Sequence, residues 1–187
     1  MSITELQLQS IMPNARRKAG VFVSALNAAM TNRKIDRPKR QAAFLAQVGH
    51  ESGQLQYVRE LGSDQYLSKY DTGPQAVKLG NTPAADGDGQ RYRGRGLIQI
   101  TVHDNYLRCS LALFGDERLL GTPELLELPQ WAAESAAWFW SVNGLNALAD
   151  QDQFNTITRR INGGLNGLED RLQLWGRTRA VLCVSST

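Results

Sequence analysis

The sequence predicts a single, mainly α-helical domain in which two lobes enclose a cleft. Apolar residues recur at helical spacing over most of the chain, and a polar, glycine-rich stretch over residues 62–96 interrupts that pattern. We find no internal repeat, linker or low-complexity segment that would divide the sequence. With 187 residues and 42% hydrophobic composition, the chain is long enough to bury one sizeable core. We therefore expect one domain over residues 1–187.

Three helical patterns occupy the first third of the chain. Thr4 and Gln7 are spaced as a capping box, which opens a short first helix. Apolar residues over 14–30 keep helical spacing for four turns. The third helix, residues 36–51, begins with an Asp and a Pro at its start and ends before a glycine.

The middle of the chain is expected to form a small, loop-rich lobe over about residues 54–101, with a short helix near 64–70. Helical patterns then resume in the second half. They cover residues 103–114, 123–128, 130–142, 152–161 and 167–182. The polar lobe therefore lies between two helical parts, and we expect the cleft where they meet.

Glu51 is the first candidate for chemistry, because it stands at the end of the third helix. Phe44, Val48 and Glu51 follow the i, i+4, i+7 rule and share a face of that helix. Glu51 is therefore expected to project from an apolar stripe, where desolvation raises the pKa of a carboxyl toward the range of a general acid. The alternative is a partly exposed glutamate at a fraying helix end, and the pattern alone leaves both open.

A second carboxylate, Glu60, follows nine residues later. The pair Ser52-Gly53 breaks the helix and could fold Glu60 back toward Glu51. Inverting glycosidases need two carboxyl groups about 6.5–9.5 Å apart. The spacing by itself does not separate this role from that of an ordinary exposed glutamate.

The stretch YRGRGLIQIT, residues 92–101, is more specific. We expect its second half to be a short strand that presents Gln99 and Thr101 on the same side, where an amide and a hydroxyl orient a sugar N-acetyl group or a water. A tight turn followed by an ordinary short strand is the simpler interpretation.

Other classes of functional site are excluded because the sequence lacks residues that each of them requires. The HES triplet at residues 50–52 lacks the second histidine of a zinc protease, and DGDGQ, residues 86–90, lacks the later ligands of a calcium loop. GRG, residues 94–96, lacks the third glycine of a dinucleotide site, and no nucleophile elbow is present. We therefore expect no metal and no organic cofactor. Cys109 and Cys183 fit no metal or redox spacing.

The charge and the hydropathy pattern limit the partners. A net charge of +3 suits an anionic polymer but is far from a nucleic-acid-binding signature, so we expect no nucleic acid partner. The first residues do not resemble a signal peptide, and no apolar stretch approaches the roughly 20 residues of a membrane span. We expect a chain that is made in a cytoplasm and does not export itself by an ordinary signal.

Five motifs occur together in the order and approximate spacing of family-19 glycoside hydrolases, the class of plant and bacterial chitinases to which many phage endolysins also belong. The motifs are FLAQVGHES, YRGRGLIQIT, HDNY, INGG and EDRLQLW. The resemblance runs from about residue 13 to 182. It is strongest to short bacterial and phage members, because the chain lacks several loops and the disulfides of the plant enzymes. The opening LQSIMPNA and the lack of a chitin-binding or cell-wall-binding module also resemble the endolysin branch.

The resemblance implies a lysozyme-like, two-lobed fold with a glycan-binding cleft. It implies that Glu51 is the general acid, that Glu60 is the general base, and that Thr101 helps to hold the attacking water. The further residues that it places at the substrate or in the cleft are His50, Tyr92, Gln99, Asn105, Asn162 and Arg171. His50 would support the acid and Arg171 would organise the acidic cleft. Leu97 replaces a proline that is frequent after GRG, and residues 62–91 match poorly.

We therefore expect an enzyme, an O-glycosyl hydrolase that cleaves β-1,4 bonds between N-acetylated sugars of bacterial peptidoglycan with inversion. In the endolysin interpretation it acts as a monomer, waits in the cytoplasm of a host bacterium, and reaches the periplasmic cell wall when a holin-type protein permeabilises the membrane. A chitinase shares the same catalytic residues. A bacterial toxin against competitors and an inactive glycan-binding module are further alternatives, although a binding module would not need both acids.

Overall fold

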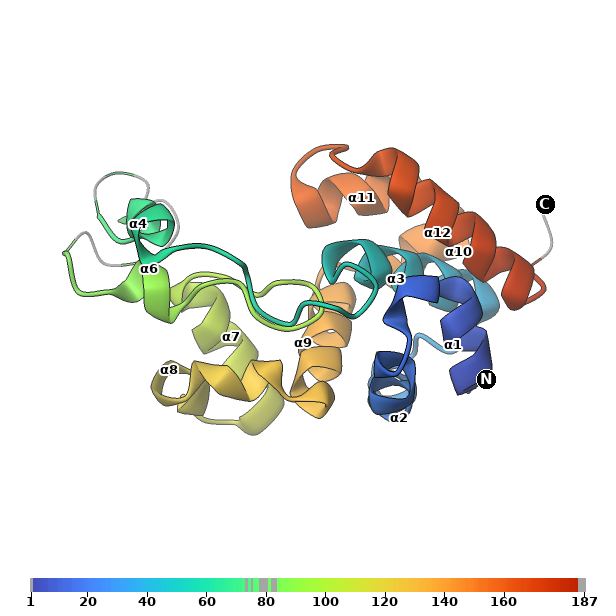
Figure 1. The fold of residues 1–187 in the computed structure, drawn as a ribbon, viewed down its shortest axis with the longest axis horizontal. Coiled ribbons are helices and arrows are strands. Elements are labelled where there is room, and N and C mark those ends of the chain that lie inside the picture. Colours follow the sequence, from blue (N-terminus) through green and yellow to red (C-terminus); the bar gives the residue numbers. More distant parts are fainter. Residues whose placement is uncertain (1, 73, 75, 78–80, 82–83, 185–187) are drawn as a thin grey trace.

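The computed structural model describes residues 2–72, 74, 76–77, 81 and 84–184, and it is mainly helical (Figure 1). The α-helices are α1 Glu5–Ile11, α2 Lys18–Asn32, α3 Pro38–Glu51, α4 Asp64–Leu67, α6 Asp88–Arg91, α7 His103–Phe114, α8 Arg118–Gly121, α9 Pro129–Val142, α10 Leu145–Asp150, α11 Phe154–Asn162 and α12 Leu168–Val181. The 3-10 helices among the described residues are η1 Pro13–Ala15, η2 Ser68–Tyr70 and η3 Pro123–Glu127. No helix in the described part of the chain is long and apolar enough to span a bilayer.

The predicted helices with strong local start and stop signals are confirmed. The Thr4 side chain accepts a hydrogen bond from the Gln7 N–H, and the Gln7 side chain accepts one from the Thr4 N–H, so the capping box is complete. The third helix begins with Pro38 in its first turn and ends at Glu51. The predicted bounds of α7 also hold. The short helix expected near 64–70 is present as α4 and η2.

Other predicted elements differ from the structure. The helix expected over 14–30 begins later, at Lys18, because η1 precedes it and Arg16 has a positive φ of 49° that no helix accommodates. The helix expected over 123–128 is η3, a 3-10 helix. Three further helices, α6, α8 and α10, were not predicted, since four to six residues are too few to show a period.

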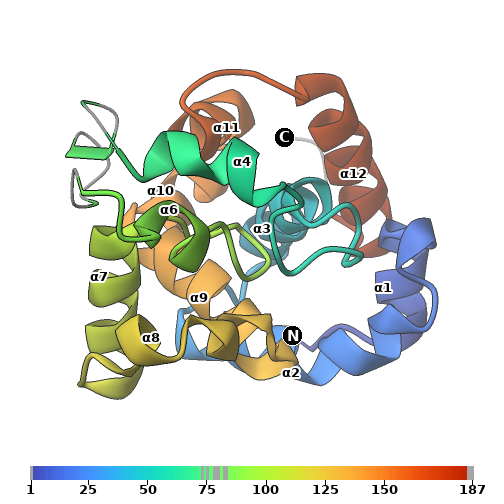
Figure 2. The same ribbon diagram turned by 60° about the vertical axis from the view of Figure 1, so that its left-hand side comes forward.

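The core of the molecule is built around α3, which lies near the centre with α12 and α10 packed against it (Figure 2). Every residue of α3 from Gln41 to Gly49 is buried. On one side Phe44 meets the edge of Trp140 from α9, with ring centroids 5.4 Å apart. Helix α2 packs along α9 below this layer. The end of α3, where Glu51 stands, is thus held on a rigid support.

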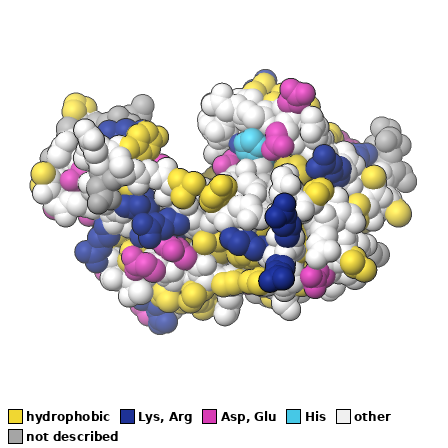
Figure 3. Space-filling model, in the orientation of Figure 1, with side chains coloured by type: hydrophobic (Ala, Val, Ile, Leu, Met, Phe, Trp, Pro, Cys, Tyr) yellow, Lys and Arg dark blue, Asp and Glu magenta, His cyan; other side chains and the backbone are white. Residues whose placement is uncertain are grey.

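The loop-rich segment lies beside the helical part, with α7 and α8 on the same side (Figure 1). Arg95 fixes this segment, although its side chain is only 5% exposed. It donates to Glu127 Oε1 over 2.8 Å, to the carbonyl of Arg91 over 2.6 Å and to the Tyr106 hydroxyl over 3.1 Å. One buried guanidinium therefore joins the GRG loop to η3 and α7. Figure 3 shows that this face of the molecule is hollowed between the two parts.

Candidate active site

Glu51 is the last residue of α3, and its carboxylate is held by an arginine. Arg171 of α12 donates from Nη2 to Glu51 Oε1 over 2.6 Å, and the two side chains are 2% and 20% exposed, respectively. The prediction of apolar surroundings for Glu51 is therefore wrong. The face of α3 that carries Glu51 is polar at this end, and a guanidinium rather than an apolar wall orients the carboxyl.

A row of buried polar groups stands behind this pair. Arg171 also donates from Nη1 to the Gln47 side chain and from Nε to the carbonyl of Asn166 over 3.2 Å. Gln47 in turn donates to the Thr158 hydroxyl over 2.8 Å. The row joins α3, α11 and α12. Each of the three guanidinium nitrogens of Arg171 donates to an acceptor, so the guanidinium is held in one orientation.

His50 supports the same helix end from the other side. Its Nδ1 lies 2.6 Å from Oδ2 of Asp170, which precedes Arg171 on α12. Gly167 lies directly against the imidazole: a Cβ on Gly167 would come within 2.2 Å of His50 Cε1, and its φ is 69°. Only glycine fits both this contact and this backbone conformation. His50 is thus locked beside Glu51.

Glu60 lies in the loop-rich part, where two hydrogen bonds join it to Gly94. The Glu60 N–H donates to the Gly94 carbonyl over 2.8 Å, and the Gly94 N–H donates to Glu60 Oε2 over 3.0 Å. The carboxylate of Glu60 faces a cavity of about 390 Å³. The cavity is lined by Glu60, Tyr70, Asn81, Gly89, Tyr92, Arg93, Gln99, Thr101 and Val102. Glu51 is not part of this lining.

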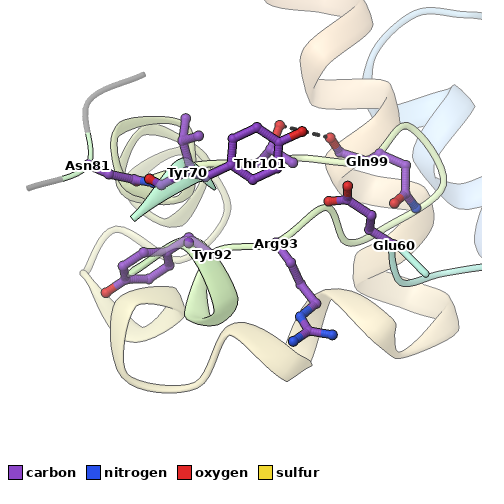
Figure 4. Close-up of a pocket in the computed structure, with 9 residues that line it drawn as sticks. Glu60, Tyr70, Asn81, Tyr92, Arg93, Gln99 and Thr101 are labelled. Carbon is purple, nitrogen blue, oxygen red and sulfur yellow. Dashed lines mark hydrogen bonds between the residues drawn. The ribbon is translucent and has the colours of Figure 1, made fainter. Parts of the chain in front are cut away.

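Gln99 and Thr101 reach the same cavity, but not from a strand. Residues 96–99 form a tight turn in which Gln99 has a φ of 58°, and Ile100 pairs with Arg95 across it. The predicted short strand is therefore wrong, because the glycines around Arg95 close the chain on itself. Thr101 donates to the Gln99 carbonyl over 3.5 Å. Figure 4 shows Glu60 and Gln99 toward one end of the cavity and Asn81 toward the other, with Thr101 and Tyr70 between them.

Gly94 explains how Glu60 and Gln99 come so close. A Cβ on Gly94 would lie 2.7 Å from Gln99 Oε1, so the amide of Gln99 occupies the space that a side chain at position 94 would need. The Gln99 amide nitrogen donates to the Gly96 carbonyl over 2.9 Å. The amide oxygen of Gln99 and the carboxylate of Glu60 therefore both lie against Gly94 at the cavity wall.

The other predicted substrate residues lie in different places. Tyr92 lines the cavity but is buried against His103 and Tyr106, with ring centroids 5.3 and 5.4 Å away, and burial raises the pKa of its hydroxyl. Asn105 is exposed in the first turn of α7 and does not line this cavity. Asn162 ends α11, and its buried Nδ2 has no hydrogen-bond partner in the described part of the chain.

Sequence reasoning missed several residues that build the site. Gln47 lies one helical turn before Glu51 on the same face, and a polar residue on that buried face was the signal that could have found it. Asp170 belongs to the EDRLQLW motif, but the sequence predicted no role for it. Arg93 belongs to the motif YRGRGLIQIT, but no role was predicted for it. Tyr70 and Asn81 reach the cavity only through the tertiary fold, and no local pattern marks them.

The arrangement offers two carboxylates of different character. Glu51 is fixed on a helix by a buried guanidinium, and Glu60 faces a cavity that also holds an amide and a hydroxyl. Such a pair can serve as general acid and general base on a bond that needs both. Within the described residues no group of three or more His, Cys, Asp or Glu side chains could hold a metal ion.

Comparison with known sequences identifies one family. The sequence model of glycosyl hydrolase family 19, described as chitinase class I, matches residues 17–154. A glycosyl hydrolase family 19 domain-containing protein of Haemophilus influenzae is 35% identical over 201 residues, which is 94% of each chain. An endochitinase of Arabidopsis thaliana is 39% identical over 124 residues, which cover 66% of this chain but only 38% of the plant protein.

Comparison with solved structures gives the same result for the fold. Chitinase C of Streptomyces griseus superposes with a TM-score of 0.76 and 26% identity, over 98% of this chain and 78% of that one. A class IV chitinase of Zea mays has a TM-score of 0.64 and 27% identity, over 90% of this chain and 82% of that one. The predicted mainly helical, two-lobed fold is therefore confirmed.

Proposed function

This chain belongs to glycosyl hydrolase family 19 and is an O-glycosyl hydrolase, and from this premise we propose that it cleaves β-1,4 bonds between N-acetylated sugars of bacterial peptidoglycan. The observation that carries the proposal is the pair of carboxylates, Glu51 on α3 and Glu60 at the cavity wall. The net charge of +3 supports an anionic polymer as substrate.

In the proposed mechanism Glu51 gives its proton to the oxygen of the leaving sugar. Arg171 already contacts the carboxyl and stabilises the carboxylate that remains after the transfer. Both Arg171 and His50 belong to the support of the acid and not to the reacting atoms. The acid is therefore oriented before the substrate arrives, because the Arg171 guanidinium that holds it is buried and each of its nitrogens donates a hydrogen bond.

Glu60 acts as the general base in this mechanism. Its Oε2 accepts the Gly94 N–H, which leaves the other oxygen to take a proton from a water. The Thr101 hydroxyl holds the same water, and Gln99 orients the N-acetyl group of the sugar. A water between base and sugar gives single displacement with inversion at the anomeric carbon. No cofactor takes part in this mechanism.

The test is to incubate the purified protein with peptidoglycan and with chitin oligomers, and to identify the new reducing ends by mass spectrometry. NMR of the first-formed product should show the α-anomer from a β-linked substrate. A β-anomer would contradict the role of Glu60. Efficient turnover of chitin without any effect on cell walls would replace the proposed substrate.

A chitinase is the second candidate, and the observation that favours it is the set of relatives and structures named as chitinases. The same incubation separates the two, because only the sugar next to the cleaved bond differs. A toxin delivered into competitors uses the same chemistry, and a neighbouring immunity gene would mark it.

The biological role that we propose is host-cell lysis. The enzyme collects as a monomer in the cytoplasm of the host bacterium, and a holin-type protein then gives it access to the periplasmic cell wall. Expression in Gram-negative cells should leave them intact until the inner membrane is permeabilised. Lysis that starts without permeabilisation would contradict this role.

A further inference from the structure

A second, smaller pocket lies beside the support of the catalytic acid. It has a volume of about 260 Å³ and is formed by η1, the turn after α3 and one face of α12. Its lining residues are Pro13, Asn14, Gln54, Asp170, Gln173 and Arg177. Five of the six are polar or charged, and none is aromatic. The pocket therefore offers hydrogen bonds and charge but no stacking face for a sugar ring.

The wall of this pocket is held in place by cross-links. The Asn14 N–H donates to the Gln54 side chain over 2.9 Å, and the Gln56 side chain donates back to the Asn14 carbonyl over 2.6 Å. Lys18 adds a bond of 2.7 Å to the Gln56 carbonyl. Gln54 and Leu55 have positive φ values of 59° and 67°, which only such restraints stabilise in non-glycine residues. The pocket is thus built before any ligand binds.

The charges of the pocket are separate rather than paired with each other. Asp170 bonds His50, its side chain is 53% exposed, and Arg177 is also exposed. Arg177 makes no hydrogen bond or ion pair with any residue that the structure describes. A carboxylate and a free guanidinium in one small pocket match a ligand that carries both an ammonium and a carboxylate.

The pocket is linked directly to the acid. Asp170 contacts His50, His50 precedes Glu51 in α3, and Arg171 next to Asp170 holds the Glu51 carboxylate. The pocket and the support of the acid therefore share Asp170, so the pocket adjoins the end of α3 that carries Glu51. Its volume lies just below the range of about 300–1,000 Å³ for small-molecule pockets, so its occupant must be small, such as one or two residues of a peptide.

We propose that this pocket binds the peptide stem that peptidoglycan carries on its lactyl-substituted sugar, and that it selects stem-bearing glycan over plain N-acetylated glycan. The inference rests on the proposed function, because it concerns the substrate of the same site. A stem peptide presents carboxylates and an ammonium, whereas chitin has no peptide. Arg177 binds a stem carboxylate, Asp170 attracts the ammonium, and the amides of Gln54 and Gln173 bind the peptide backbone.

The experiment uses a soluble four-sugar peptidoglycan fragment, either with its stems or after an amidase has removed them. The measured quantity is the ratio of kcat/KM for the two substrates. We expect the wild type to favour the stem-bearing fragment about tenfold, Arg177→Glu to lower this ratio to about one, and Arg177→Lys to restore part of it. Arg108→Glu, an equally exposed change on α7, should keep the wild-type ratio.

The outcomes separate this inference from the proposed function. Equal efficiency of the wild type on both fragments, or an unchanged ratio in Arg177→Glu, overturns the stem pocket and leaves peptidoglycan hydrolysis standing. No cleavage of either fragment by the wild type overturns the proposed function and this inference with it. Should Arg177→Glu not fold, Gln173→Glu on the same helix repeats the test, and its circular dichroism spectrum must match that of the wild type.

Discussion

Glu51 and Arg171 are 120 residues apart in sequence, and a hydrogen bond of 2.6 Å joins their side chains. Arg171 is only 1% exposed, so its charge is compensated almost entirely by this carboxylate and by the oxygens of Gln47 and Asn166. The orientation of the proposed general acid is therefore a property of the last helix as much as of α3.

Glu51→Gln tests the acid itself. The amide keeps an oxygen for Arg171 but has no proton to give, so kcat should fall by about 10²–10⁴-fold, which is the usual contribution of general acid–base catalysis. The loss of charge assistance should cost about 1 kcal/mol in the free energy of unfolding. Product release from soluble peptidoglycan and urea unfolding measure the two effects. Near-normal turnover by the folded variant would remove Glu51 from the mechanism.

Arg171→Lys tests the support. One ammonium cannot serve Glu51, Gln47 and the Asn166 carbonyl together, so we expect a loss of about 2–4 kcal/mol in the free energy of unfolding from buried acceptors without donors. Because the Glu51 carboxyl is then no longer held in one orientation, kcat should also fall while KM changes little. An unstable variant with an unchanged kcat would show that Arg171 serves stability alone. Thr158→Val, at the far end of the row, is the matched control and should cost stability with a smaller effect on kcat.

Gly167→Ala and Gly163→Ala form a matched pair. Both glycines have a positive φ, 69° and 73°, so both variants lose about 1–2 kcal/mol to the left-handed backbone. The methyl group at position 167 also collides with His50, whereas position 163 is open. We therefore expect Gly167→Ala to cost about 1–3 kcal/mol more in urea unfolding. Equal costs for the two variants would disprove the packing of His50 on Gly167.

Asp150→Asn should show a pH-dependent loss of stability. Hydrogen bonds from Arg40, at 2.8 and 2.6 Å, lower the pKa of Asp150 in the folded chain. The ion pair therefore stabilises the fold above the unfolded pKa of about 3.9, and this contribution disappears as the pH falls through the lower, folded pKa. We expect the wild type to exceed the variant by about 0.5–1 kcal/mol at pH 7. The difference should shrink below about pH 4, and a difference that stays constant over the titration contradicts the ion pair.

The two cysteines should react differently with iodoacetamide. Cys109 is buried, and burial raises the pKa of its thiol to about 12, whereas Cys183 is exposed and both are free. At pH 8 the native protein should gain one adduct by mass spectrometry, at Cys183, and two adducts in urea. The native Cys183→Ser variant should gain none, and labelling of Cys109 in that variant would contradict its burial.

Much of the fold could be predicted because its signals are local. Pro38 and Gly53, which lies two residues beyond Glu51, mark the ends of α3, and Gly115 ends α7 with a positive φ of 75°. The break at Arg16 could not be predicted, because an arginine with a positive φ leaves no trace in the hydrophobic period. Periodicity also says nothing about helices of one turn.

Some residues of the candidate site could be predicted from the sequence, but the geometry of the site could not. Glu60, Gln99 and Thr101 do reach one cavity, yet the alternation of LIQIT indicated a strand where the chain makes a turn. The glycines on either side of Arg95 were the better signal, since they allow the chain to close tightly. The polar support of Glu51 was missed because Gln47 and Arg171 meet across 124 residues, and no local pattern reports such a contact.

The long separation between α3 and α12 also sets the order in which the protein becomes functional. Chains are synthesised from the N-terminus, and contacts between distant segments form late because the loop that joins them must close first. Helix α3 leaves the ribosome more than a hundred residues before Arg171 does. The carboxyl of the proposed acid therefore has no fixed orientation in a nascent chain, and a polypeptide interrupted before α12 contains Glu51 but lacks the Arg171 that orients it. Under the proposed mechanism, hydrolytic activity therefore requires that α12 has been synthesised and packed against α3.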